Sequence, residues 1–248
     1  MRLPGLRTIV TGGASGMGLA YATRLVEAGA SVVVGDVDER GFASLPTGVD
    51  AMRVDVRDEA DVERFVAFAD ERLGGLDALV NNAGILREGS LVKRDRTTGA
   101  ITRFPRAEFD RVLDVSLLGT MLVTRAFAAR KLVLGGPGVI VNVSSIARHG
   151  SRGRTAYVAA KAGVSALTTT WAKELGPSGL RVCAIAPGAV RTPMTAGMTE
   201  AQERALVAKI PVGRLATPDD LFLALRFALE CDYFHGRTID VDGGMAID

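Results

Sequence analysis

The sequence is poor in the residues that hold metals or form disulfides. Among its 248 residues there are only two cysteines, Cys183 and Cys231, and two histidines, His149 and His235. The cysteines are far apart and match no metal-ligand or redox spacing. We therefore expect no structural metal site, and a reducing compartment is the simplest setting for these thiols.

A strong net charge and a long apolar run are also missing. The chain has 30 Lys and Arg against 28 Asp and Glu, a net charge of +2. This balance disfavours a dedicated nucleic-acid or membrane-surface protein, which usually carries a basic stripe. The first residues lack the apolar region of a signal peptide, and no apolar run approaches the roughly 20 residues of a membrane helix. We expect a soluble, cytoplasmic protein with no nucleic-acid or membrane partner.

Apolar residues make up 48% of the chain, and short β-branched runs alternate with longer segments of helical period. The predicted strands are Leu6–Thr11, Ser31–Gly35, Ala51–Val54, Ala78–Val80, Val139–Val143, Val182–Ile185 and Thr238–Val241. The predicted helices are Met17–Ala28, Glu59–Leu73, Phe109–Leu134, Tyr157–Leu175 and Asp219–Leu229. Such alternation implies right-handed crossovers and a parallel sheet covered on both faces. Because no linker or repeat interrupts it, we expect one domain over residues 1–248.

Two segments break this alternation. Arg87–Pro105 is charged and loop-like, and two short runs around a turn at Gly99 predict a small hairpin within it. Met194–Ile210 predicts a mobile helical flap, in which Met194 and Met198 form either an apolar lid or part of the core. A plain surface excursion is the alternative for both segments.

A glycine-rich loop, Thr11–Gly18, lies between the first predicted strand and the first predicted helix. Glycines let the backbone approach a pyrophosphate closely, and the helix N-terminus behind them offers free N–H groups. The strand–loop–helix context is the one that a dinucleotide-binding motif requires. The predicted cofactor-binding residues of this loop are Gly12, Ser15, Gly16, Met17 and Gly18.

Asp36 lies 18 residues after Gly18, at the end of the second predicted strand. A carboxylate there accepts hydrogen bonds from the adenosine ribose and repels a 2′-phosphate. The neighbouring Val37 supplies no compensating positive charge. The pattern therefore predicts NAD rather than NADP, against the alternative of a turn glycine cluster followed by a surface carboxylate.

These residues resemble the short-chain dehydrogenase/reductase family in its common single-domain form, and further motifs match in order over almost the whole chain. They are Asp55-Val56, Asn81-Asn82-Ala83-Gly84, Asn142-Val143-Ser144-Ser145, Tyr157-Val158-Ala159-Ala160-Lys161, Pro187-Gly188 and Asp242-Gly243-Gly244. The resemblance implies a Rossmann-type, doubly wound α/β fold with a seven-stranded parallel sheet flanked by helices. It also implies a bound nicotinamide cofactor and usually a homotetramer.

The same resemblance implies roles for three groups of residues along the cofactor. Asp55 and Val56 would flank the adenine. The middle of the cofactor would be lined by Asn82, Ala83 and Gly84. The nicotinamide end would be held by Pro187, Gly188, Val190 and Thr192.

Tyr157 and Lys161 are one helical turn apart and share a face of the predicted helix. A free phenol has a pKa near 10. A nearby ammonium and the positive charge of an oxidised nicotinamide favour the phenolate. We predict Tyr157 as the general acid and base, and Lys161 as its partner that also holds the nicotinamide ribose. The alternative is an ordinary amphipathic helix with a half-buried tyrosine.

A serine after the Val139–Val143 strand is expected to hydrogen-bond the reacting oxygen. Ser145 matches the family motif, because it is the second of the pair and precedes an apolar residue. Ser144 matches the usual distance, 13 positions before Tyr157, whereas Ser145 is 12 before it. We predict Ser145 and keep Ser144 as the alternative.

The chain departs from the family pattern at Ser116, where an asparagine usually helps to hold a proton-relaying water. Serine retains a donor and an acceptor but is shorter. We place Ser116 in the catalytic set and expect the enzyme to remain active.

Four basic residues lie between the serine pair and Tyr157 and would border the substrate mouth: Arg148, His149, Arg152 and Arg154. They suggest either an acidic or carrier-linked substrate or, more simply, a solvated loop. The sequence does not identify the substrate.

The function that these features favour is hydride transfer between NAD and an alcohol or ketone. One alternative is a 3-oxoacyl-thioester reductase, for which NADP would be expected, so Asp36 counts against it. Another is a non-catalytic dinucleotide-binding protein, which only Ser116 favours.

Overall fold

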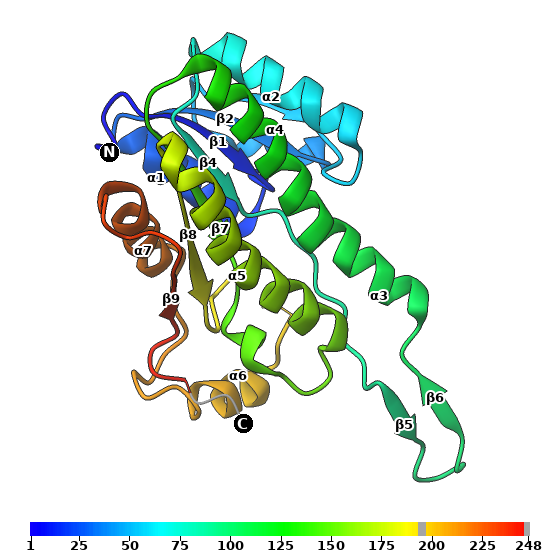
Figure 1. Cartoon of the computed structure of the whole chain (residues 1–248). Helices are drawn as coiled ribbons and strands as arrows, with labels where there is room; N and C mark the ends of the chain where they lie inside the picture. The colour runs from blue at the N-terminus through cyan, green and yellow to red at the C-terminus, as the bar shows by residue number, and fades with distance from the viewer. Residues whose placement is uncertain (193–196, 246–248) are drawn as a thin grey trace.

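The structure is a computed structural model that describes residues 1–192 and 197–245, and a seven-stranded parallel sheet runs through it (Figure 1). The strand order is β3-β2-β1-β4-β7-β8-β9, and every neighbouring pair is parallel. The strands are β1 (Arg7–Thr11), β2 (Ser31–Asp36), β3 (Asp50–Arg53), β4 (Ala78–Asn81), β7 (Gly138–Val143), β8 (Leu180–Pro187) and β9 (Thr238–Val241). The predicted Rossmann-type sheet is confirmed.

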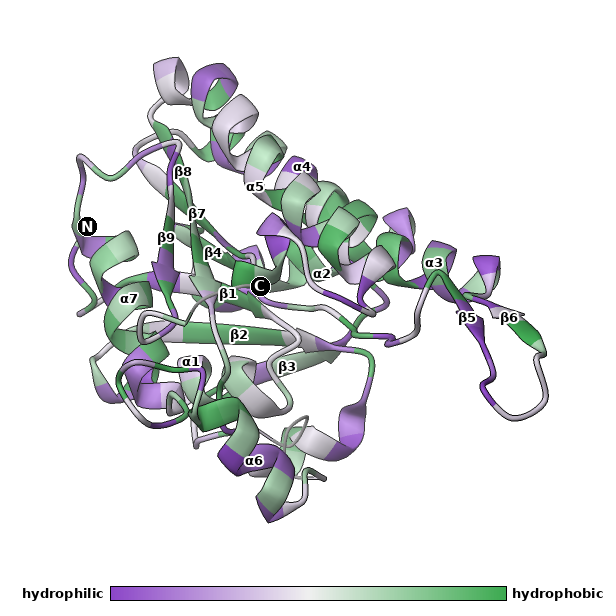
Figure 2. Ribbon diagram, turned by 90° about the horizontal axis from the view of Figure 1, so that it is seen from below, coloured by the Kyte–Doolittle hydropathy of each residue, from purple (hydrophilic) through white to green (hydrophobic). Residues whose placement is uncertain are grey.

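Helices cover both faces of the sheet (Figures 1 and 2). One face carries α1 (Gly16–Glu27) and α7 (Pro218–Glu230), and the other carries α2 (Glu59–Leu73), α4 (Gly119–Leu134) and α5 (Thr155–Leu175). Neighbouring residues of one strand enter different clusters, since Val10 packs with α1 and α7 whereas Ile9 packs with α2 and α4. The alternation of side chains along a strand therefore explains why the central strands are apolar throughout.

The predicted helix Phe109–Leu134 differs from the structure in two ways. It begins at Arg106 as α3 (Arg106–Leu113), and a π-helical turn, η2 (Asp114–Leu118), separates α3 from α4. In that turn the N–H of Gly119 bonds to the carbonyl of Asp114, five residues back. Such turns cannot be read from an apolar periodicity and often mark functional sites.

Of the helices in the described ranges, only the run Arg106–Leu134 is long and apolar enough to cross a membrane by length and composition. In the fold, 56% of its most apolar window is buried, against α2, α5 and the sheet. Packing within the fold accounts for its apolar residues.

Three short 3-10 helices were not predicted: η1 (Glu39–Ser44), η3 (Ile146–His149) and η4 (Gly176–Ser178). Their lengths of three to six residues give too little periodicity for recognition in a sequence.

The predicted hairpin is present as β5 (Val92–Arg94) and β6 (Ile101–Arg103), which pair antiparallel and extend away from the body (Figure 1). Its base is fastened to the segment before α5. The N–H of Gly89 donates to the carbonyl of Gly153 at 2.8 Å, and Glu88 pairs with Arg154 at 2.8 Å. The insertion is thus coupled to the loop that leads into Tyr157.

The predicted flap Met194–Ile210 contains one helix, α6 (Glu200–Val207), which begins with a capping box at Thr199. Met198 is half-buried. Met194 lies outside the described residues.

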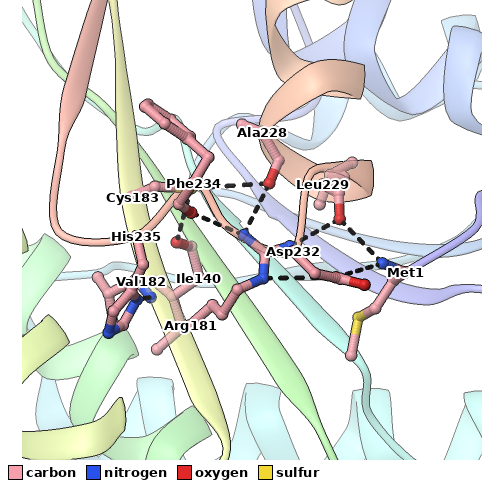
Figure 3. Close-up of polar contacts among 10 residues, drawn as sticks. All are labelled: Met1, Ile140, Arg181, Val182, Cys183, Ala228, Leu229, Asp232, Phe234 and His235. Carbon is pink, nitrogen blue, oxygen red and sulfur yellow. Dashed lines mark hydrogen bonds and ion pairs between the residues drawn. The ribbon is translucent and has the colours of Figure 1, made fainter.

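Arg181 of β8 holds the C-terminal end of α7 (Figure 3). Its guanidinium donates to the carbonyls of Ala228 at 3.0 Å, Leu229 at 2.7 Å and Phe234 at 3.0 Å. The last carbonyls of a helix have no partner within the helix, so the arginine supplies the missing donors and fixes α7 on the sheet.

Replacing Arg181 with methionine is expected to lower the free energy of unfolding by about 3 kcal/mol, because buried carbonyls lose charge-assisted hydrogen bonds. Urea unfolding measures this change. Arg226→Met is the control, since Arg226 is exposed and, among the residues that the structure describes, pairs only with Glu230 in the next turn. Its expected cost is about 0.5 kcal/mol or less. Equal losses in the two variants would contradict the capping role.

Candidate active site

The loop between β1 and α1 has the geometry of a phosphate cradle. Gly12 and Gly16 have positive φ angles of 64° and 54°, which favour glycine. A Cβ on Gly18 would lie 2.0 Å from the carbonyl oxygen of Gly12, so the loop closes only with glycine there. Ser15 makes no side-chain cap on α1, and the first turn of α1 has no acidic residue. Its free N–H groups therefore suit an anion.

Thr11 and Asn82 fix this loop to the end of β4. The Thr11 hydroxyl accepts from the N–H groups of Asn82 and Ala83, each at 3.2 Å. The Asn82 side chain donates to the carbonyls of Thr11 and Gly12, at 3.2 and 2.9 Å. Asn82 thus holds the glycine loop in place through hydrogen bonds to its backbone. Thr11, which was not among the predicted site residues, bonds the same two segments together.

A pocket of about 300 Å³ opens beside this loop at the C-terminal edge of the sheet. Among the predicted residues it is lined by Gly12, Ser15, Asp36, Asp55, Val56, Ala83 and Gly84. The Asp36 carboxylate accepts from the N–H groups of Ala14 and Asp38, each at 3.0 Å, so its position is fixed. A glycine cradle, a helix N-terminus and a fixed carboxylate together fit an adenosine dinucleotide.

Two arginines also line this pocket, and no sequence motif indicated them. Arg57 is held by Asp55, with Nη2 2.6 Å from Oδ2, and this contact keeps the pKa of the Asp55 carboxyl below its usual value. Arg111, on α3, is exposed and has no ion pair within the described ranges. Arg111 therefore adds a positive charge to this lining that no carboxylate of the described ranges neutralises.

Tyr157 lies in the first turn of α5, and the structure brings it to Ser145. Burial raises the pKa of the Tyr157 phenol, while a hydrogen bond with Ser145 and the charge of Arg154 act in the opposite direction. The protein alone therefore keeps Tyr157 protonated at neutral pH. A lowered pKa of Tyr157, as expected from the sequence, would therefore need the positive charge of an oxidised nicotinamide.

Ser144 points elsewhere. It is buried, and its hydroxyl lies 2.9 Å from the carbonyl oxygen of Lys161 and 2.8 Å from the Ser165 hydroxyl. Ser145 accepts from the N–H of Ala147 at 3.2 Å and faces the tyrosine. Of the two candidate serines, the structure places Ser145 beside Tyr157.

Lys161 is buried, and its ammonium donates to the carbonyl of Val143 at 2.7 Å. The ammonium lies 5.8 Å from the centre of the Tyr157 ring. Burial lowers the pKa of Lys161 to about 8. The lysine therefore still carries charge at neutral pH beside the tyrosine.

Ser116, in the π-helical turn, borders the same space as Lys161. A Cβ on Gly84 would lie 3.4 Å from both the Lys161 ammonium and the Ser116 hydroxyl. The Ser116 hydroxyl accepts from the N–H of Ile85 at 3.1 Å. Ser116 thus anchors the backbone that forms the pocket wall.

Some predicted residues lie outside the lining of this pocket. Gly16, Met17 and Gly18 belong to the first turn of α1. At the end of β8, the N–H of Gly188 donates to the carbonyl of Val241 at 3.0 Å, and a Cβ on Gly188 would meet the Asp242 backbone at 2.7 Å. Residues 193–196, which follow Thr192, are outside the described residues. The roles of Pro187, Gly188, Val190 and Thr192 stay predictions.

The basic residues before Tyr157 are largely neutralised. Arg148 binds both oxygens of Asp240, with Nη2 3.0 Å from Oδ2, and Arg154 pairs with Glu88. Arg152 and His149 are exposed. The four residues therefore do not form a continuous cationic lip.

Comparison with known proteins gives consistent matches over the whole chain. A family model described as enoyl-(acyl carrier protein) reductase matches residues 12–246. The 3-oxoacyl-[acyl-carrier-protein] reductase of Thermotoga maritima is 36% identical over 100% of both chains. The cis-4-hydroxycyclohexanecarboxylate dehydrogenase of Sinomonas cyclohexanicum is 38% identical, over 95% of this chain and 94% of its own. The 3-alpha-(or 20-beta)-hydroxysteroid dehydrogenase of Mycobacterium bovis is 38% identical, over 98% and 90%.

The buried Lys161 predicts a pH-dependent stability. Its folded-state pKa of about 8 lies below the ordinary value of 10.5, so its ammonium destabilises the folded protein at low pH. This cost is relieved as the pH rises from about 8 to 10.5. In the cofactor-free protein, Lys161→Met should raise the free energy of unfolding near neutral pH by about 2 kcal/mol. The gain should vanish above pH 10.5.

Urea unfolding across this pH range measures the difference. Lys173→Met, at an exposed lysine of the same helix, is the control and should leave the pH dependence unchanged. A constant difference between wild type and Lys161→Met at every pH would contradict the prediction.

Proposed function

Because the chain belongs to the short-chain dehydrogenase/reductase family, we propose that this oxidoreductase transfers hydride between NAD and an alcohol or ketone. The proposal rests on the hydrogen bond between Tyr157 and Ser145 beside the dinucleotide pocket. The Lys161 ammonium lies 5.8 Å from the centre of the Tyr157 ring. Cytoplasmic location and a homotetrameric assembly are part of the same proposal.

Tyr157 moves the proton in this mechanism. The glycine loop and Asp36 would hold the dinucleotide, whose nicotinamide would supply or accept the hydride. In the reducing direction the phenol, protonated at neutral pH, gives its proton to the carbonyl oxygen. In the oxidising direction the phenolate takes the proton of the alcohol, and the Lys161 ammonium favours that phenolate. General acid–base help of this kind contributes roughly 10²–10⁴-fold to a rate.

Ser145 and Ser116 support this proton transfer in different ways. The Ser145 hydroxyl, already paired with Tyr157, is placed to hydrogen-bond the reacting oxygen. Ser116 acts as a positioning residue, because its hydroxyl holds the N–H of Ile85 next to Gly84. The asparagine usual in the family is therefore replaced by a shorter side chain that keeps a backbone contact.

The preference for NAD rests on Asp36. Its carboxylate is fixed by two backbone N–H groups in the pocket and would oppose a 2′-phosphate. Arg40, the nearest following arginine in sequence, is engaged by Asp38. Arg111 is the one lining cation without an ion pair in the described part of the chain, so the preference requires that Asp36 outweigh it.

A 3-oxoacyl-thioester substrate is the second candidate. The Thermotoga maritima relative carries that activity in its name. A relative from Thauera aromatica, 35% identical, is named as a (2S)-[(R)-hydroxy(phenyl)methyl]succinyl-CoA dehydrogenase subunit. Asp36 separates the two candidates, because the thioester reductase would be expected to use NADP.

Asp36→Ala is expected to weaken NAD binding by roughly 10- to 100-fold, because a charged acceptor of ribose hydrogen bonds is lost. NADP binding should weaken less or improve. Isothermal titration with both dinucleotides measures the change, and Glu39→Gln, at an exposed neighbouring carboxylate, is the control. If wild type binds NADP as tightly as NAD, the cofactor assignment is wrong.

Tyr157→Phe should lower turnover by roughly 10²–10⁴-fold while NAD still binds, since only the proton donor is removed. Ser145→Ala should also lower turnover. Ser144→Ala should keep turnover but lose about 1–2 kcal/mol of stability, because two hydrogen bonds of a buried hydroxyl are lost.

A panel of alcohols and ketones assayed with both cofactors provides the measurement. Undiminished turnover in Tyr157→Phe would overturn the mechanism. An inactive but folded Ser144→Ala beside an active Ser145→Ala would reverse the serine assignment.

A further inference from the structure

The starts of β1 and β4 lie at the edge of the sheet opposite the glycine loop (Figure 1). A second cavity, of about 360 Å³, opens beside them. It lies between the segment before β1 and the connection from α4 to β7. Its polar lining comprises Arg2, Arg7, Asp77, Lys131, Gly135 and Gly136. It shares no lining residue with the dinucleotide pocket.

Positive charge is in excess in this lining. Arg7 and Asp77 satisfy each other through two contacts, Nε to Oδ2 at 2.8 Å and Nη2 to Oδ1 at 2.7 Å. The Lys131 ammonium forms an ion pair with Asp77, but its distance of 3.9 Å from Oδ1 is too long for a hydrogen bond. Within residues 1–192 and 197–245 it has no hydrogen bond. The one carboxylate of the cavity is thus shared by Arg7 and Lys131, so the lining keeps a net positive charge.

The position of Lys131 is built into the fold. Its side chain is only 4% exposed, and its stem lies where a side chain at residue 138 would be. A Cβ on Gly138 would meet the Lys131 Cε at 3.2 Å and Cγ at 3.3 Å. The stem is therefore held before any ligand arrives, so binding through the ammonium costs little further side-chain entropy.

A structural role at the helix end does not account for this arrangement. Lys131 is in the last turn of α4, where a cation suits the helix dipole. However, Lys173 also lies in the last turn of its helix, α5, and its side chain is exposed. The dipole thus does not require burial. Burial also lowers the pKa of Lys131, and the Arg7 charge acts in the same direction, while Asp77 opposes both. A bound anion would stabilise the charged form of the Lys131 ammonium.

We propose that this cavity binds a phosphate group, with the Lys131 ammonium and the Arg2 guanidinium as its ligands. Phosphate oxygens accept charge-assisted hydrogen bonds from both groups. Arg2 is exposed at the rim, so it can close over a ligand that Lys131 holds from inside. Inorganic phosphate and a small organic phosphate offer the same chemistry.

Isothermal titration with inorganic phosphate at constant ionic strength tests the site. Wild type should bind phosphate with millimolar or better affinity and should bind acetate more weakly. Lys131→Met should weaken phosphate binding roughly 10- to 100-fold, because one charge-assisted hydrogen bond is lost. Lys173→Met, the matched control in α5, should leave it unchanged.

Two results would overturn the proposal. One is no binding by wild type at tens of millimolar phosphate. The other is equal binding by wild type and Lys131→Met, which would place the phosphate on the glycine loop instead. Should Lys131→Met fail to fold, Arg2→Gln serves in its place, and undiminished binding in that variant also counts against the site. A parallel titration with glycerol phosphate identifies the source, since tighter binding than inorganic phosphate indicates an organic ligand.

Discussion

The hydrogen bonds between the end of β7 and α5 are the constraint on which the active site depends. The last residues of this strand and its exit, Asn142–Ser144, each bond to α5. The Asn142 amide donates to the Thr168 hydroxyl. The Val143 carbonyl accepts from the Lys161 ammonium, and the Ser144 hydroxyl donates to the Lys161 carbonyl. These contacts fix the rotation and register of the helix, so that Tyr157 in its first turn meets Ser145.

Holding the Lys161 ammonium in this buried position lowers the stability of the folded protein, and its charge beside Tyr157 explains why it is there. A buried ammonium with one carbonyl partner is poorly compensated, and its lowered pKa expresses that cost. A methionine at position 161 would pack without the penalty, but it would remove the cation beside Tyr157. The pKa of Lys161, about 8, leaves the group charged at neutral pH, as stabilisation of a phenolate requires. The fold gives up some stability for a positive charge held beside the reacting proton.

The sequence predicted those parts of the candidate site that depend on residues close together in the chain. The glycine loop, Asp36 and the strand ends follow from composition and spacing, because parallel strands bring their C-terminal ends to one edge. Motif and spacing disagreed over Ser144 and Ser145. The motif favoured Ser145, and the structure places that residue beside Tyr157, because the Ser144 hydroxyl packs under α5. The π-helical turn and the arginine at position 111 likewise depend on contacts between distant segments.

The insertion between β4 and α3 is bonded to the loop that leads into Tyr157. Relatives that are 33–38% identical are named for galactitol, hydroxysteroid and hydroxycyclohexanecarboxylate oxidation, so their shared core cannot set specificity alone. In this chain the base of the β5–β6 hairpin is bonded to the loop before Tyr157, through Gly89 to Gly153 and Glu88 to Arg154. The hairpin therefore fixes the backbone of the loop before Tyr157, and it does so through residues other than the predicted proton-transfer residues.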